Sequence, residues 1–159
     1  AFAVFADFKN KERTETALST AYNTLVDEKR GVIRLFNNPF TRDDIDNIGY
    51  IAKYPEGIRE NAGQYTHAAV WLASAMLKFG KKEEGEKLLR YINPLSFYEN
   101  EGKAKRYRAE PYVLAADISY GNGIEGRGGW THFTGSAAWF YKCAAEDLLR
   151  DKNRQNNPM

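Results

Sequence analysis

The sequence is poor in the residues that form covalent cross-links and metal sites. It has one cysteine, Cys143, and two histidines among 159 residues. A single cysteine cannot form an internal disulfide, and no set of cysteines and histidines has the spacing of a zinc site. The sequence therefore predicts neither a disulfide framework nor a bound metal ion.

A long apolar run and an excess of charge are also missing. No apolar segment approaches the roughly 20 residues that cross a bilayer, and no charged leader with a cleavage site is recognisable. The 23 basic and 21 acidic residues give a net charge of +2, which does not indicate nucleic acid or an acidic membrane as a partner. We expect a cytoplasmic protein that binds neither.

The composition is that of a globular domain, with 43% hydrophobic and 28% charged residues. The chain begins with AFAVFA, which has neither a methionine nor a helix-capping residue before it. It ends with the polar stretch RDKNRQNNPM. We therefore expect a C-terminal piece of a larger protein, with one domain over residues 1–150 and a polar tail over residues 151–159.

Apolar residues recur at helical spacing through most of the chain. Leu18, Tyr22 and Leu25, for example, lie on one face of a helix. The expected helices cover residues 11–28, 64–79, 82–92, 111–119 and 135–150, the last capped by Thr134. The expected loops cover residues 41–57, 95–108 and 121–130, and a short extended arm covers residues 31–40. No segment alternates as a strand does, so the predicted class is all-α.

The stretch RENAGQYTH, from Arg59 to His67, concentrates polar side chains just before a helix. His67 could donate a hydrogen bond to a phosphate or another oxyanion near neutral pH. A lone histidine at such a position is more often a hydrogen-bonded structural residue, and the residues alone leave both interpretations open.

A glycine-rich run leads into the last helix as GRGGWTHFTGSAAWFY. Thr134 and Gly135 would offer a hydroxyl and free backbone N–H groups at a helix start, where the helix dipole favours an anion. The run lacks the G-K-[ST] of a Walker loop, and no strand precedes it as in a dinucleotide fold. An ordinary capped helix is the alternative.

Glu60, Arg59 and Tyr54 are candidates for a sugar site, since carboxylates bind hydroxyl groups and aromatic rings stack on sugar C–H surfaces. A surface ion pair between Arg59 and Glu60 is the simpler alternative. Asp117 would be a buried or pocket-facing acid that needs a partner. Trp130, in the glycine-rich run, is placed to contact a ligand.

Three segments together resemble the catalytic barrel of the inverting glycoside phosphorylases, glycoside hydrolase family 94. They are RENAGQYTHAAVW, YRAEPYVLAADIS and GRGGWTHFTGSAAWFYK, in the family's order. The family includes cellobiose and chitobiose phosphorylases and the C-terminal region of cyclic β-1,2-glucan synthases. The resemblance implies that residues 1–150 form the C-terminal portion of an (α/α)6 toroid.

The resemblance also implies roles for single residues. His67, Thr134 and Gly135 match the phosphate-binding residues of the family, and Glu60 matches a carboxylate that binds the donor sugar. Arg59 and Tyr54 fall where some members line the acceptor subsite. Ala62 and His132 depart from the family pattern, which has a glycine and an aromatic residue there.

The implied reaction is the inverting cleavage of a β-linked gluco-oligosaccharide by inorganic phosphate to an α-sugar 1-phosphate, without a further cofactor. The family's general acid is an aspartate expected upstream, so this chain holds no catalytic residue of its own and would be inactive alone. The implied partners are the remainder of the barrel and, in the full-length protein, a second copy as a homodimer. An inverting hydrolase in which Glu60 or Asp117 activates water, or a non-catalytic carbohydrate-binding fragment, is the alternative.

Overall fold

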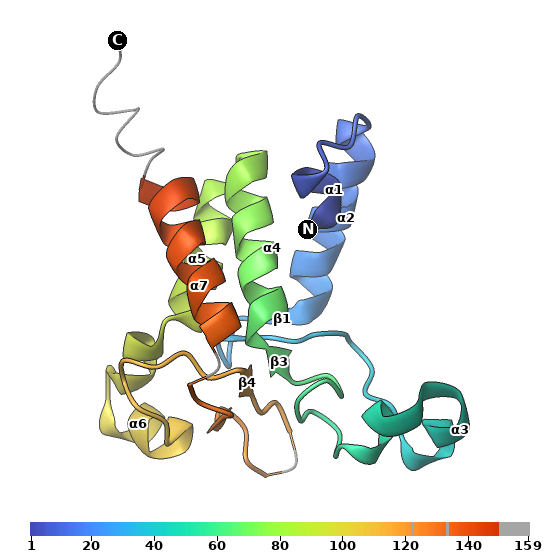
Figure 1. Ribbon diagram of the computed structural model, residues 1–159, viewed down its shortest axis with the longest axis vertical. Coiled ribbons are helices and arrows are strands. Elements are labelled where there is room, and N and C mark those ends of the chain that lie inside the picture. Colours follow the sequence, from blue (N-terminus) through green and yellow to red (C-terminus); the bar gives the residue numbers. More distant parts are fainter. Residues whose placement is uncertain (122, 133, 150–159) are drawn as a thin grey trace.

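The computed structural model describes residues 1–121, 123–132 and 134–149, so the polar tail predicted for residues 151–159 lies outside the described residues. Helices α2, α4, α5 and α7 run side by side, and most of the shorter elements gather at one end of them (Figure 1). These helices are α2 (Lys11–Leu25), α4 (Thr66–Phe79), α5 (Lys82–Ile92) and α7 (Thr134–Lys142), the last continued by a π-helical segment, Cys143–Leu149. The all-α class predicted from the sequence is confirmed, and the arrangement is consistent with part of an (α/α)6 toroid.

Within residues 1–121, 123–132 and 134–149, the shorter elements are three helices, three 3-10 segments and five strands of two residues each. The helices are α1 (Phe2–Phe5), α3 (Ile45–Ile48) and α6 (Glu101–Tyr107), and the 3-10 segments are η1 (Arg42–Asp44), η2 (Gly49–Lys53) and η3 (Pro94–Tyr98). The strands are β1 (Val26–Asp27), β2 (Val32–Ile33), β3 (Gln64–Tyr65), β4 (Asp117–Ile118) and β5 (Gly128–Gly129).

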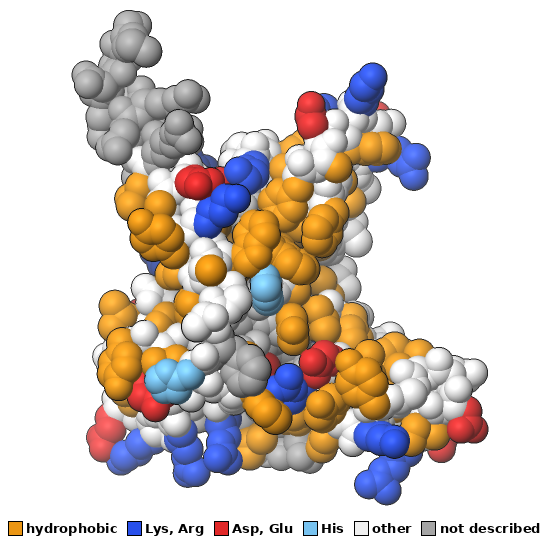
Figure 2. Space-filling model, viewed as in Figure 1, with side chains coloured by type: hydrophobic (Ala, Val, Ile, Leu, Met, Phe, Trp, Pro, Cys, Tyr) orange, Lys and Arg blue, Asp and Glu red, His pale blue; other side chains and the backbone are white. Residues whose placement is uncertain are grey.

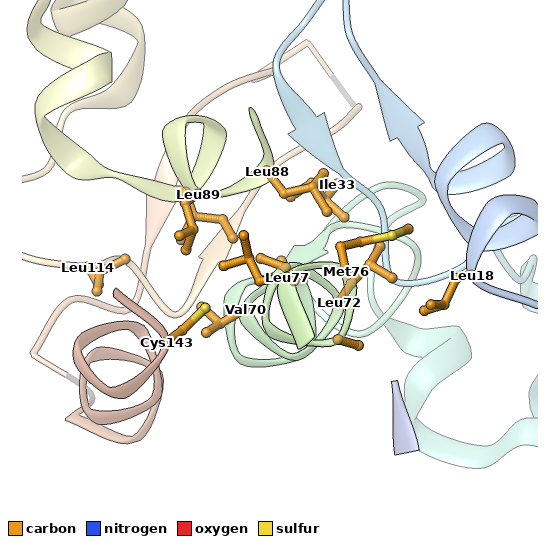
Figure 3. Close-up of a cluster of buried hydrophobic side chains, with 14 residues drawn as sticks. Leu18, Ile33, Val70, Leu72, Met76, Leu77, Leu88, Leu89, Leu114 and Cys143 are labelled. Carbon is orange, nitrogen blue, oxygen red and sulfur yellow. The ribbon is translucent and has the colours of Figure 1, made fainter. Parts of the chain in front are cut away.

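Helix α4 lies at the centre of the core, in contact with α1, α2, α5 and α7. Nine of its residues are buried, because its sequence is apolar around most of the helix rather than along one stripe. Val70 and Met76 are fully buried, and Leu88 of α5 and Cys143 after α7 pack in the same cluster (Figure 3). The helix ends at Gly80, whose φ of 92° gives the left-handed cap that favours glycine.

Two small antiparallel sheets lie at the end where α4 begins. β1 pairs with β2, and β4 is the middle strand of β3–β4–β5. Tyr65 stands opposite Asp117, and Asp117 stands opposite Gly129. The backbone N–H of Thr66 donates to the carbonyl oxygen of Ala116, with 2.9 Å between nitrogen and oxygen. This hydrogen bond joins the sheet directly to the first turn of α4.

The helix predicted for residues 111–119 is wrong. Asp117 and Ile118 form strand β4 instead, paired on both sides. A short apolar run fits a buried strand as well as a buried helix, and here the pairing with two other segments decides. Asp117 is nevertheless buried, as expected.

The loops predicted for residues 41–57 and 95–108 are also wrong, since both contain helical turns. Asn100 caps α6 by accepting a hydrogen bond from the Lys103 N–H, and Lys105 pairs with Glu101 at 2.6 Å. A polar helix of this length has no apolar stripe, which is why periodicity missed it.

Three helix boundaries differ from the expected ones. Residues 26–27 form β1, so α2 ends earlier than residue 28, and residues 64–65 form β3 before α4 begins. Thr134 is the first residue of α7 rather than the residue before it. In the part of the chain that the structure describes, no helix is both long and apolar enough to cross a bilayer.

We expect Gly85→Ala to destabilise the fold, although alanine favours helices. A Cβ at Gly85 would lie 2.6 Å from Leu77 Cγ and 3.1 Å from the Leu77 backbone nitrogen, because α4 and α5 cross closely there. Overpacking of this kind costs about 1–3 kcal/mol, more than the roughly 1 kcal/mol gained in helix propensity.

The measurement is the free energy of unfolding in denaturant. Gly102→Ala is the matched control, since Gly102 lies on exposed α6 and a Cβ there would meet only Asn100 Oδ1, at 3.4 Å. This variant should be neutral or more stable. Equal stability of the two variants would contradict the close crossing of α4 and α5.

Candidate functional site

The sheet β3–β4–β5 brings two separate stretches of the chain to the start of α4. Residues 54–67 approach through β3, and residues 116–121 and 123–130 approach through β4 and β5. The backbone N–H of Ala116 donates to the Trp130 carbonyl at 3.1 Å, which holds the second stretch as a hairpin. The polar residues of both stretches therefore meet beside the first turn of α4.

His67 lies in this first turn, against the start of α7. A Cβ at Gly135 would lie 3.3 Å from His67 Cε1, so the glycine lets the backbone of α7 approach the imidazole ring closely. Trp71, one turn further along α4, has its ring centroid 4.7 Å from that of His67. Thr134 and Gly135 are exposed to solvent. Together with Ser136, these residues form what we name the anion cluster.

Polar side-chain atoms of the anion cluster are buried without a partner. His67 Nε2, Trp71 Nε1 and Ser136 Oγ have no hydrogen-bond partner among the described residues, and the same holds for Thr66 Oγ1. An unsatisfied buried polar atom costs about 1–3 kcal/mol. Such a set next to a helix N-terminus is suited to an anion, which would accept from the donors and interact with the helix dipole.

Burial also affects the protonation of His67. It lowers the pKa of the imidazole below its ordinary value, because desolvation disfavours the charged form. The ring is therefore neutral at pH 7 in the absence of a ligand. A neutral imidazole has one N–H, with which it can donate a hydrogen bond without a buried positive charge.

A second group, which we name the arginine cluster, surrounds the guanidinium of Arg59. Arg59 Nε lies 3.3 Å from Glu60 Oε2, and Arg59 Nη1 lies 4.0 Å from Asp117 Oδ1. The guanidinium carbon stands 4.2 Å from the ring centroid of Trp130 and 5.9 Å from that of Tyr54. The arginine cluster thus combines carboxylates and a cation, which can bind hydroxyl groups, with aromatic faces, which can stack on C–H surfaces. This combination is suited to binding a polyol.

Several residues of these loops have a left-handed backbone. Arg59, Ala62, Trp130 and His132 have φ values of 49°, 65°, 56° and 66°. This conformation is unfavourable for residues other than glycine, and such strain gathers at functional sites. The surrounding fold therefore holds these four residues in backbone conformations that are unfavourable in free energy.

The two amides of RENAGQYTH are structural. Asn61 Nδ2 donates to the carbonyls of Phe40 and Tyr54, while Asn61 Oδ1 accepts from the Phe40 N–H at 2.7 Å. Gln64 Oε1 accepts from the Ile33 N–H at 2.8 Å. Both side chains are fully buried, so they fix the loop that carries Arg59 and Glu60.

Comparison with known protein families decides which family the chain belongs to. The model of the glycosyl hydrolase 94 superfamily, catalytic domain, matches residues 1–150. This chain belongs to the glycosyl hydrolase 94 superfamily. The resemblance seen in the three sequence segments is thereby confirmed.

The relatives of this chain include a cyclic glucan synthase and two phosphorylases. The chain is 44% identical over 146 residues to the cyclic beta-(1,2)-glucan synthase NdvB of Rhizobium meliloti (strain 1021), covering 91% of this chain and 5% of the relative. It is 25% and 27% identical to the N,N'-diacetylchitobiose phosphorylases of Vibrio furnissii and Vibrio proteolyticus, covering 92% of this chain and 18% of each relative. The chain thus spans a small part of the relatives that it matches.

The structure of this glycosyl hydrolase 94 chain places the predicted site residues in two groups. His67 lies so close to Gly135 that a Cβ there would be 3.3 Å from its ring, and Thr134 is next to Gly135 at the start of α7. Arg59 and Glu60 form an ion pair, and Tyr54 lies beside Arg59. Their roles in binding stay predictions.

Sequence reasoning missed three contributors to the site. Trp71 was not among the predicted site residues, although its position four residues after His67 on the same helix face was a signal for it. Ser136 follows the Thr-Gly pair directly and is buried. Gly129 could not be identified, because its importance depends on the strand register that places it against Asp117.

We expect the pKa of His67 to lie below about 6.5 without phosphate and to rise when phosphate is added, since burial disfavours the imidazolium and a bound anion favours it. As the unfolded chain binds this proton more tightly, stability should fall as the pH drops below about 6.5. NMR titration of the imidazole Cε1–H resonances measures the pKa.

With two histidines in the sequence, the His67→Gln variant assigns the resonance. A His67 pKa above the ordinary value in the absence of phosphate would contradict a half-buried, neutral ring. A pKa that phosphate leaves unchanged would contradict an anion next to it.

Proposed function

We propose that the protein containing this chain is an inverting glycoside phosphorylase that cleaves a β-linked glucoside with inorganic phosphate. The observation that carries the proposal is the anion cluster. His67 Nε2 is buried without a partner among the described residues, in a ring that leaves little room for a side chain at Gly135, at the start of α7. Two relatives named as phosphorylases support the same reaction class.

The anion cluster supplies what a phosphate nucleophile requires. The exposed Thr134 hydroxyl and the free backbone N–H groups of the first turn of α7 donate to phosphate oxygens, and His67 adds a third kind of donor. Phosphate held in this way attacks the anomeric carbon from the face opposite the leaving group, and the configuration inverts. It replaces the base-activated water of an inverting hydrolase, so a second catalytic carboxylate is not needed.

The arginine cluster is the proposed sugar side. Glu60 accepts hydrogen bonds from hydroxyl groups of the donor sugar, while Arg59 and Tyr54 line the acceptor subsite. The ring of Trp130 is 55% exposed, so it can stack on a sugar face while Arg59 contacts the ring. The aspartate that protonates the glycosidic oxygen is expected in an upstream segment.

The remainder of the catalytic domain is the proposed partner of an exposed hydrophobic face. Hydrophobic side chains gather over α1, α4 and α7 on the face shown in Figure 2. Phe2 is 64% exposed and Tyr141 is 75% exposed. Apolar surface of this extent is typical of an interface. We place further helices of the toroid against it, in a full-length protein that is a homodimer.

The reaction is tested with the intact protein and β-1,2-, β-1,3- and β-1,4-linked glucobioses and chitobiose, each with and without phosphate. We expect phosphate-dependent release of an α-sugar 1-phosphate from one of them. Free sugar released equally without phosphate would make the protein a hydrolase and overturn the assignment of the anion cluster.

His67→Ala should lower kcat/KM for phosphate by about 100-fold, the effect of removing one donor from a charge-stabilising site. His132→Ala is the matched control, because His132 is 69% exposed and lies 3.8 Å from Glu110 rather than in the anion cluster. It should leave kcat/KM for phosphate unchanged. Equal losses in the two variants would contradict the role of His67.

A further inference from the structure

Asp117 is a buried carboxylate on the middle strand of the sheet, and the fold makes room for it. It is 3% exposed, and its strand neighbour on β5 is Gly129. A Cβ at Gly129 would lie 2.8 Å from Asp117 Oδ1. The glycine at this register position is therefore required by the carboxylate, which is a packed part of the fold and not a solvated surface acid.

The carboxylate faces the guanidinium of Arg59. Asp117 Oδ1 and Arg59 Nη1 lie 4.0 Å apart, and neither atom has a hydrogen-bond partner among the described residues. Burial raises the pKa of Asp117, and the charge of Arg59 opposes that effect. A buried carboxylate without a cation would cost several kcal/mol, so the two side chains stabilise each other's charge.

Arg59 connects Asp117 to the residues that face a ligand. Its guanidinium also contacts the Glu60 carboxylate and stands over the ring of Trp130. The positive φ of Arg59 leaves its backbone in an unfavourable conformation, so side-chain contacts contribute to holding it. Displacement of the guanidinium would therefore move both Glu60 and Trp130.

We propose that Asp117 is a positioning residue that fixes the Arg59 guanidinium, and through it Glu60 and Trp130, in the arrangement that binds the sugar. This inference rests on the proposed function for the identity of the ligand. Asp117 is too buried to contact the substrate or to activate water, so it acts through Arg59. It sets the affinity for the saccharide and leaves phosphate binding to the anion cluster.

The test compares the Asp117→Asn, Arg59→Ala and double variants of the intact protein. Asp117→Asn should raise KM for the saccharide about tenfold, while KM for phosphate stays within about twofold, because only a sugar contact is displaced. The double variant should match Arg59→Ala alone, since Asp117 has no effect once its target is removed. Independent, additive effects would overturn the inference.

Asp147→Asn is the matched control for loss of a buried ion pair. Asp147 lies 2.7 Å from Lys78 and accepts from Ser74, on the π-helical segment after α7. This variant should lose thermal stability and keep both KM values. If it raises KM for the saccharide as Asp117→Asn does, the effect is a general loss of stability and the inference is wrong.

Arg59→Lys keeps a charge for Asp117 and loses the planar contact with Trp130. It should raise KM for the saccharide even if Asp117→Asn fails to fold, and an unchanged KM would overturn the inference.

Direct calorimetric titration with the saccharide measures binding without the reaction, so it tests this inference separately from the proposed function. If no sugar phosphate is formed, the proposed function fails, and the inference stands only if Arg59→Lys still weakens saccharide binding.

Discussion

The antiparallel pairing of β3 with β4 is the contact on which the rest of the site depends. It places Tyr65 opposite Asp117 and ties Thr66 to Ala116, so that the loop before α4 and the glycine-rich hairpin lie side by side. Each strand has two residues, and such a small sheet is not stable alone. Its stability comes from α4, whose burial against the neighbouring helices fixes where β3 ends and where Thr66 begins the helix.

The buried polar side chains near the start of α4 differ in whether their atoms have hydrogen-bond partners within the described residues. The side chains of Asn61 and Gln64 are buried and support the loop, Asn61 through both its amide atoms and Gln64 through Oε1. His67 Nε2 and Trp71 Nε1 are buried and lack a partner within the described part of the chain, so they are available to a ligand. A missing partner alone does not mark an atom as a ligand contact, since Gln64 Nε2 lacks one as well, and His67 is distinguished by its place beside the start of α7.

Local sequence signals predicted the elements whose stability is local or whose apolar pattern is long. Residues 82–92 form α5 as expected, and α4 ends at Gly80 as expected. Residues 111–119 were mispredicted because the identity of β4 is decided by β3 and β5, which are distant in the sequence. For the same reason, the sequence did not indicate that Asp117 lies next to Arg59. The three motifs, in contrast, were sufficient to group His67 with Gly135.

The proposed reaction depends on phosphate binding between His67 and the start of α7. A crystal structure of the intact protein with bound phosphate tests it most directly. We expect phosphate oxygens within hydrogen-bond distance of His67, the Thr134 hydroxyl and the Gly135 N–H. Phosphate bound elsewhere, for example in the basic groove lined by Arg30, Arg90 and Arg106, with nothing at His67, would contradict it.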